Sequence, residues 1–212
     1  MGTFSKGGFG GFRGKVGSMV GSSWKGLEVL RSKPVRRRGK SSPDQLQQQA
    51  KFSLMTKFLR PLTPLLDQAY NATVIHMSGF NKALSYNILN AIAGVYPAYT
   101  VNYPKILLGQ GDLANAESPA GGSAAAGKLS IRWEDNSGSG SARAGDKAFV
   151  AVYCADLNRW SYKQHAAIRS DGVAALDVPA FAGQKVQTWL GFVSAKLNRV
   201  TTSLYVGEVN VL

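Results

Sequence analysis

The chain has 212 residues, 44% of them hydrophobic, and its 25 Lys and Arg against 12 Asp and Glu give a formal net charge of +13. This hydrophobic content suffices for a packed core and excludes wholesale disorder, while one cysteine and two histidines exclude a disulfide framework and a Cys/His zinc site. No apolar run reaches the ~18–20 residues of a membrane span and no continuous apolar secretion signal opens the chain, so we expect a soluble, cytoplasmic protein or one in a particle assembled there.

Residues 1–40 are predicted to form a basic, glycine-rich arm. They contain ten basic residues and one acidic residue, which gives +9, and ten of the 24 glycines. The remaining 172 residues carry 15 basic and 11 acidic side chains, which gives only +4.

Large apolar side chains recur between the glycines of this arm, and a flexible linker would not contain them. An arm without a core of its own must bury them on its own body or on a neighbouring subunit. The predicted subunit-contact residues are Phe4, Phe9, Phe12, Val16 and Trp24.

A compact basic cluster closes the arm. Its members are the predicted nucleic-acid-binding residues Lys33, Arg36, Arg37, Arg38 and Lys40. Such residues neutralise phosphates without sequence preference. The alternatives are a solvated tail or a contact with an acidic patch on another subunit.

Residues 41–113 are predicted to be a helical and extended region. Ser42 is a good N-cap and Pro43 suits the first helical position. Apolar residues follow at helical spacing until prolines end or kink the helix; they are Leu46, Ala50, Leu54, Met55, Phe58 and Leu59. A second helix is expected over Asn81–Ala93, with Leu84, Ile88, Leu89 and Ile92 on one side. Thr73–Met77 and Tyr96–Leu108 are expected to be extended.

Residues 114–127 are small and uncharged except for Glu117, so they are predicted to be a linker or loop. Residues 128–212 contain short segments with alternating apolar residues, which predict an immunoglobulin-like β-sandwich. The expected strands are Lys128–Glu134, Ala148–Cys154, Val173–Val178, Lys185–Val193 and Ser203–Val211. Trp133 and Trp189 are expected in the core, and Cys154 is expected to be a small core residue. The overall fold class is therefore α+β.

Motifs of known chemistry are incomplete in this sequence. Gly39-Lys40-Ser41 imitates the end of a phosphate-binding loop, but Pro34 stands where that motif requires glycine. His76 and His165 are far apart in sequence and lack neighbouring carboxylates, so each is expected to be a strand or loop histidine. We expect no catalytic residue, metal site, cofactor or small-molecule substrate, and hence no enzyme.

The N-terminal motifs resemble those of an uncharacterised family of small basic bacterial proteins. They are Gly-Thr-Phe-Ser-Lys-Gly at 2–7, Gly-Lys-Val-Gly at 14–17 and Gly-Ser-Ser-Trp-Lys-Gly at 21–26. Features at Gln47–Phe52, Tyr86-Asn87, Gly111–Leu113 and Tyr205–Gly207 are also similar. The resemblance implies no activity, because the family is one of unknown function. The C-terminal half separately resembles immunoglobulin and fibronectin type III sandwiches.

Three functions are consistent with this sequence. The first is a self-assembling structural protein, a phage-derived filament, sheath or capsid-like subunit, whose main partner is itself and whose arm also meets nucleic acid. The second is an accessory protein that binds nucleic acid without sequence preference. The third, suggested by the sandwich alone, is an adhesion or carbohydrate-binding module.

Overall fold

The computed structural model describes residues 2–3, 13–24, 26–35, 40–70, 76–196 and 199–212. The chain forms two compact units, one of Met1–Leu46 with Ile75–Met77 and one of Gln47–Val74 with Ser78–Leu212. We call the second unit the body. Each unit is described by itself.

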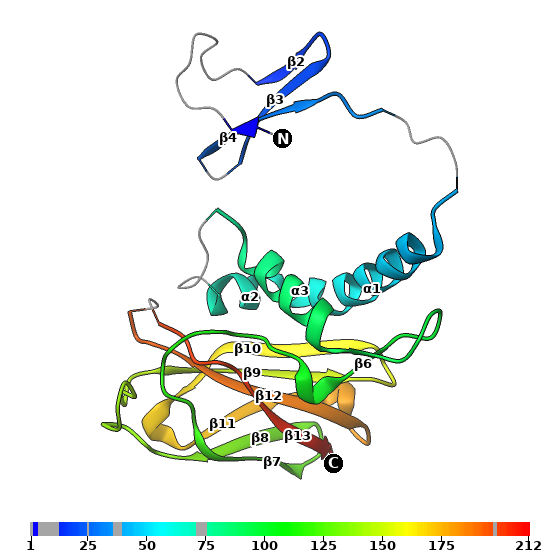
Figure 1. Cartoon of the computed structure of the whole chain (residues 1–212). Helices are drawn as coiled ribbons and strands as arrows, with labels where there is room; N and C mark the ends of the chain where they lie inside the picture. Colours follow the sequence, from blue (N-terminus) through cyan, green and yellow to red (C-terminus); the bar gives the residue numbers. More distant parts are fainter. Residues whose placement is uncertain (1, 4–12, 25, 36–39, 71–75, 197–198) are drawn as a thin grey trace. The chain divides into compact units, whose positions relative to one another are not determined.

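The first unit contains a four-stranded antiparallel sheet, here called the N-terminal sheet, in the order β1-β4-β3-β2 (Figure 1). Its strands are β1 (Gly2–Thr3), β2 (Gly14–Val16), β3 (Met19–Trp24) and β4 (Leu27–Ser32). The tight turns after β2 and β3 contain Gly17 at φ +57° and Gly26 at φ +81°, a conformation that side chains rarely adopt. The glycine-rich arm predicted for residues 1–40 therefore contains a sheet, because Gly17 and Gly26 make hairpin turns between paired strands.

Helix α1 spans Pro43–Leu59. Ser42 begins it as predicted: its hydroxyl accepts from the Gln45 amide and the Gln45 side chain accepts from the Ser42 amide, both at 3.3 Å. The predicted break at the prolines is also confirmed, because the 3-10 turn η1 (Arg60–Leu62) leads into α2 (Thr63–Ala69).

Helix α3 covers Gly79–Asn90 and is shorter at its C-terminal end than predicted. Ile92–Ala93 instead forms β5, which pairs with β6 (Thr100–Val101). Leu89 was expected on the apolar side, but 82% of its surface is exposed. Between Tyr96 and Leu108 only β6 and the 3-10 turn η3 (Tyr103–Lys105) are regular. The strand predicted at Thr73–Met77 lies mostly outside the described residues.

The rest of the body is an antiparallel β-sandwich. A four-stranded sheet in the order β10-β9-β12-β13 packs against a three-stranded sheet in the order β11-β8-β7. The strands are β7 (Glu117–Ala125), β8 (Lys128–Glu134), β9 (Lys147–Cys154), β10 (Arg159–Ile168), β11 (Val173–Asp177), β12 (Lys185–Val193) and β13 (Leu204–Asn210). This division is typical of immunoglobulin-like sandwiches and confirms the predicted architecture.

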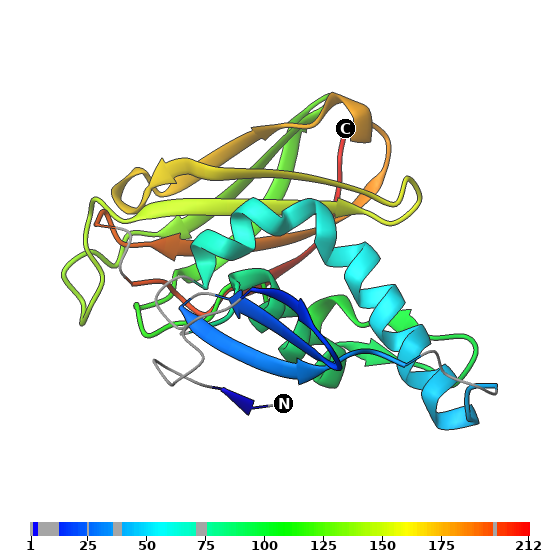
Figure 2. The ribbon, with the colours of Figure 1, turned by 90° about the horizontal axis from the view of Figure 1, so that it is seen from above.

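Two hydrophobic cores meet at the four-stranded sheet. One lies between the two sheets and contains Trp133, Val150 and Cys154. The other lies between the helices and the opposite face of the four-stranded sheet, and contains Leu66 and Trp189. Figures 1 and 2 show helices α1 to α3 over the four-stranded sheet, with the three-stranded sheet on the other side. The predicted burial of Trp133, Trp189 and Cys154 is confirmed.

The predicted boundaries inside the body are wrong in two respects. Glu117–Ala125, expected within the linker 114–127, is strand β7 and pairs with β8. The helical region 41–113 and the sandwich 128–212 are not separate, because Leu66 and Trp189 belong to one core.

Candidate functional site

The strand register sorts the side chains of the N-terminal sheet into two faces. Lys15 pairs with Val20, which pairs in turn with Arg31. Directly paired residues project to the same side, and neighbours along a strand alternate. One face therefore presents Lys15, Val20, Ser22, Trp24, Leu27, Val29 and Arg31. The opposite face presents Val16, Met19, Gly21, Ser23, Glu28, Leu30 and Ser32.

Apolar side chains on both faces of this sheet are open to solvent. The exposed fractions are 57% for Val16, 42% for Met19 and 55% for Trp24. Across residues 13–24 and 26–32, only Gly21 is buried. This part of the sheet therefore has no hydrophobic core of its own, as predicted for residues 1–40.

The predicted contact residues do not form one cluster. Val16 and Trp24 lie on opposite faces of the N-terminal sheet, and Phe4, Phe9 and Phe12 lie outside the described residues. Two apolar surfaces are thus available for contact, one on each side.

The predicted basic cluster is only partly described. Lys33 and Lys40 are exposed, and Arg36, Arg37 and Arg38 lie outside the described residues. The strand register places two other cations, Lys15 and Arg31, on either side of Val20 on the face that also carries Trp24. Alternation within a single strand could not have identified these two cations as sharing a face, because that also requires the register of the two hairpins.

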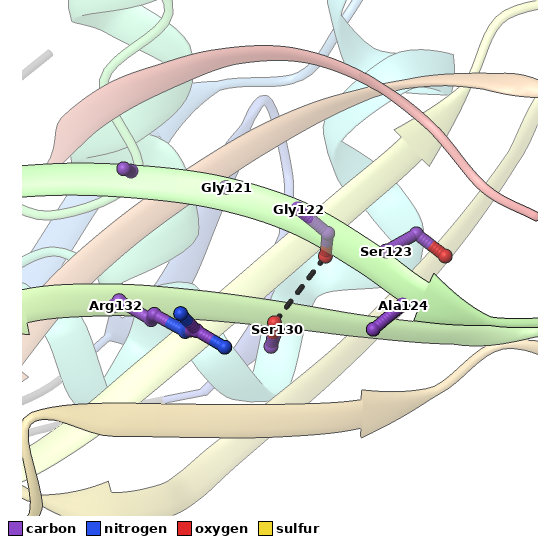
Figure 3. A pocket seen from close by; sticks show the side chains of 7 residues that line it. Gly121, Gly122, Ser123, Ala124, Ser130 and Arg132 are labelled. Carbon is purple, nitrogen blue, oxygen red and sulfur yellow. Dashed lines mark hydrogen bonds between the residues drawn. The ribbon is translucent and has the colours of Figure 1, made fainter.

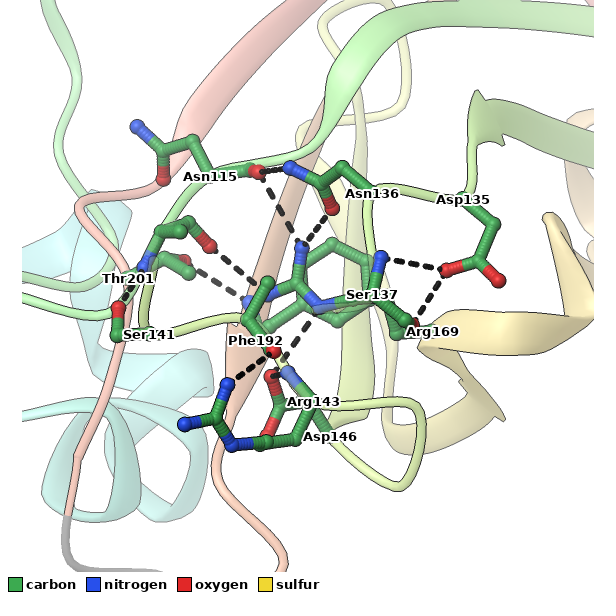
Figure 4. A network of polar contacts seen from close by, with 12 residues as sticks. Asn115, Asp135, Asn136, Ser137, Ser141, Arg143, Asp146, Arg169, Phe192 and Thr201 are labelled. Atoms are coloured by element: carbon green, nitrogen blue, oxygen red, sulfur yellow. Dashed lines mark hydrogen bonds and ion pairs between the residues drawn. The ribbon is translucent and has the colours of Figure 1, made fainter. Parts of the chain in front are cut away.

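In the body, a fully buried arginine organises one end of the sandwich (Figure 4). Arg169 Nε lies 3.1 Å from a carboxylate oxygen of Asp146, which is also buried. Its terminal nitrogens donate to the carbonyls of Ala114 (2.8 Å) and Asn115 (3.2 Å), and to Asn136 Oδ1 (2.7 Å). Burial lowers the pKa of the Arg169 guanidinium, and Asp146 opposes that shift.

Aromatic residues complete this site. The guanidinium lies 4.0 Å from the centre of the Phe192 ring, and Trp133 Nε1 donates to the Arg169 carbonyl at 2.8 Å. The contacts tie Ala114, Asn115 and Asn136 to Arg169, so the network positions these loops. Sequence reasoning missed it because no local pattern marks Arg169 as buried.

The side chains that could serve as a nucleophile or a base, Cys154 and His165, do not form a common site. Cys154 is buried. His165 Nε2 lies 3.0 Å from Gln68 Nε2, and desolvation lowers the pKa of this imidazole. Across the described ranges, no three His, Cys, Asp or Glu residues are grouped in a way that could hold a metal ion. No helix in the same ranges is long and apolar enough to cross a membrane.

A cavity of 310 Å³ lies over β7 and β8 (Figure 3). Small residues such as Gly122 and Ala124 line it, and Ser130 donates to the Gly122 carbonyl at 3.4 Å. Arg132 pairs with Ala120 across the two strands and supplies the positive charge of the lining. The cavity lacks aromatic groups that could hold a planar ligand.

A second cavity of 360 Å³ lies between α3, η3 and the start of β13. Its lining includes Tyr86 and Asn90 from α3, Lys105 from η3, Ser203 just before β13 and Tyr205 within β13. Aromatic, cationic and hydroxyl groups therefore meet in one hollow of the body.

Residues 11–207 match the model of a family described as "Family of unknown function (DUF6266)". The chain belongs to this family. Membership in DUF6266 confirms the expected relationship to proteins of unknown function. The matched range begins before β2 and ends within β13, so DUF6266 includes parts of both the N-terminal sheet and the body.

Comparison with solved structures finds a similarity to the fn3 domain of human collagen alpha-1(XX) chain. The identity is 12%, the match covers 49% of this chain and 90% of that chain, and the TM-score is 0.36. The assignment of a β-sandwich rests on the strand order of the body. No curated protein matches the chain.

Proposed function

We propose that this protein is a non-enzymatic, self-assembling structural subunit of a filament, sheath or capsid-like particle, derived from a bacteriophage. Its N-terminal sheet mediates the contacts between copies. The observation that carries the proposal is the exposure of Val16, Met19 and Trp24 on a sheet without a described core.

A sheet of this size requires a packed hydrophobic face to be stable. Burying a large apolar side chain stabilises by about 1.5–3 kcal/mol. Neighbouring copies that cover Met19 on one face and Trp24 on the other would therefore stabilise the assembly substantially. Strand β2 lies at an edge of the sheet and its three residues are exposed. An edge strand can also pair with a strand of another chain.

In the proposed assembly, the N-terminal sheet of one copy meets a different surface on the next copy. Such a contact is heterologous. Contacts of this kind close into rings or continue into filaments. This geometry favours a particle with many subunits over a simple two-fold dimer.

Sedimentation velocity of the full chain tests the proposal. We expect the wild-type protein to form large species, and the triple variant Val16→Ser, Met19→Ser, Trp24→Ser to sediment as a small species. Deletion of residues 2–33 should have the same effect. The matched control is Leu89→Ser with Val95→Ser, which removes body side chains that are 82% and 79% exposed. Equal particle sizes for the wild type and the triple variant would refute the proposal.

A second candidate function is binding of nucleic acid without sequence preference. The specific observation is that Lys15 and Arg31 share a face with Trp24, which combines phosphate-neutralising cations with an aromatic surface. The predicted cluster of Lys33, Lys40 and the arginines at 36–38 adds further charge.

Salt-dependent binding measurements test this second candidate. Lys15→Ala with Arg31→Ala should weaken binding to all sequences alike and reduce the slope of log affinity against log salt by about 2. The control is Lys128→Ala with Lys163→Ala, two exposed lysines of the body. An unchanged salt slope in the Lys15/Arg31 variant would remove this surface as the binding site.

A further inference from the structure

The cavity between α3, η3 and β13 has a firmly held wall. The buried side chain of Asn87 accepts from the Leu107 amide and donates to the Leu107 carbonyl, both at 2.9 Å. The Tyr70 hydroxyl donates to the same carbonyl at 3.1 Å. On the other side, Ser203 Oγ accepts from the amides of Leu108 (2.8 Å) and Gly109 (3.3 Å). The hollow is therefore formed before any ligand arrives.

Four polar side chains around this hollow can each donate a hydrogen bond into it: those of Tyr86, Asn90, Lys105 and Ser203. Ser203 Oγ already accepts two hydrogen bonds, so its hydroxyl can only donate further. Lys105 is exposed and takes part in none of the three ion pairs formed among the described residues, and Tyr86 adds a hydroxyl to the lining. Asn90 uses one amide hydrogen on the Tyr86 carbonyl at 2.8 Å and keeps the other. The lining contains no carboxylate. Such a set of groups favours an anion rich in acceptors.

Two aromatic rings in the lining favour a ligand that carries a planar ring as well as an anionic group. Tyr86 and Tyr205 both line the hollow, and the Tyr205 hydroxyl donates to Gln187 Oε1, which fixes the position of that ring. Tyrosine faces bind planar rings by stacking. The volume of 360 Å³ falls within the ~300–1,000 Å³ range of small-molecule sites.

We propose that this cavity binds a nucleoside phosphate, with the base against Tyr86 or Tyr205 and the phosphate at Lys105. The ligand is either a free mononucleotide or one nucleotide of a single strand, and the two share this chemistry. The site lies in the body and does not depend on assembly through the N-terminal sheet.

Calorimetric titration of the full chain with adenosine 5′-monophosphate, adenosine and a hexa-adenylate tests the proposal. Lys105→Ala should weaken monophosphate binding about ten-fold, because a charge-assisted contact is lost, and should leave adenosine binding unchanged. Tyr86→Ala should weaken both ligands about ten-fold through loss of stacking. The matched controls are Lys163→Ala and Tyr96→Ala, which alter a lysine and a tyrosine outside the cavity.

Lys105 is exposed, so Lys105→Glu tests the site even if Tyr86→Ala does not fold. If the wild type binds the monophosphate and does not bind the hexa-adenylate, the ligand is a free nucleotide. If it binds both, and the Lys105 variants weaken both by the same factor, the site also holds one nucleotide of a single strand. No binding of either ligand by the wild type would overturn the proposal. Binding that neither Lys105 variant changes would also overturn it.

Discussion

The buried positive charge of Arg169 is compensated by the hydrogen-bond acceptors around it. Its side chain is fully buried and meets the Asp146 carboxylate, two backbone carbonyls and the Asn136 side chain. A buried guanidinium requires such a complete set of acceptors, because an unpaired buried charge is strongly destabilising. The same contacts fasten the Ala114–Asn115 segment and the loop at Asn136 to the sandwich.

Arg169→Met should lower the free energy of unfolding by about 3–5 kcal/mol, because it leaves the Asp146 carboxylate buried without its partner. Urea unfolding measures the loss. Adding Asp146→Asn to Arg169→Met should restore part of it, since the stranded charge is then removed.

The matched control is the exposed pair Arg199–Asp112, whose side chains lie 2.7 Å apart. Arg199 lowers the pKa of the Asp112 carboxyl, but both groups are open to water, which screens their interaction. Arg199→Gln should therefore cost far less than Arg169→Met. Equal shifts of the urea midpoint in the two variants would contradict the role assigned to the buried pair.

Core residues in regular patterns were predictable, and this arginine was not. Trp133, Trp189 and Cys154 are large or apolar groups within alternating segments, and all three are buried as expected. Arg169 follows β10 in the 3-10 turn η4 (Arg169–Asp171). Its burial depends on acceptors that come from distant parts of the chain, and no local pattern encodes them.

At the scale of elements, strand β9 shows why some strands were easy to predict. Val150, Val152 and Cys154 face the core between the sheets, while Phe149 and Tyr153 face the helices. Apolar residues on both faces of one strand indicate burial from two sides.

The two strands of the sandwich that were not predicted, β7 and β10, lack that signal. Strand β7 consists of Gly, Ala, Ser and Pro after Glu117, residues with weak strand propensity. It forms by pairing with β8 in a register that shifts twice. In β10 the alternation of Trp160 and Tyr162 is interrupted by a register shift between Lys163 and Ala167.

Two glycines within strands, Gly191 and Gly122, differ in the space that is available for a side chain. A Cβ at Gly191 in β12 would lie 2.3 Å from the ring of Phe149, and that ring is fully buried in the core. Gly191→Ala should therefore cost about 1–3 kcal/mol through overpacking. Thermal unfolding measures this loss.

Gly122→Ala in β7 is the matched control, because a Cβ there meets nothing within 4 Å. It should be neutral or stabilise the protein by up to about 1 kcal/mol, since alanine restricts the unfolded chain. A loss of stability at Gly122 as large as that at Gly191 would show that the close approach of Phe149 is not the cause.

At the scale of the whole molecule, most of the net positive charge lies in the same segment as a group of exposed apolar side chains. The first 40 residues carry +9 of the formal +13, and they include the N-terminal sheet with exposed Val16, Met19 and Trp24. Composition alone distinguishes this segment in the sequence. The hairpins were not predicted, because a glycine permits a turn but does not show which segments pair as strands on either side of it.

The body should behave as one cooperative unit although it contains helices and a sandwich. Strand β9 contributes to both cores, and Trp160 Nε1 in β10 donates to the Phe58 carbonyl in α1 at 2.7 Å. Loss of the helical layer would expose one face of the four-stranded sheet. The remaining sandwich would then lack a stable cover for Phe149 and Trp189.

We therefore expect Leu66→Ala in the helical core and Ile131→Ala between the sheets to shift the same single transition. Both side chains are fully buried, and each truncation should cost about 2–5 kcal/mol. Urea unfolding followed in parallel by tryptophan fluorescence and far-ultraviolet circular dichroism provides the measurement, and the two probes should give coincident curves for all three proteins. If Leu66→Ala instead produced an early transition that left a second one at the wild-type midpoint, the helices and the sandwich would be separate folding units. The shared strand β9 makes that outcome unfavourable, because its two faces cannot lose their cores independently.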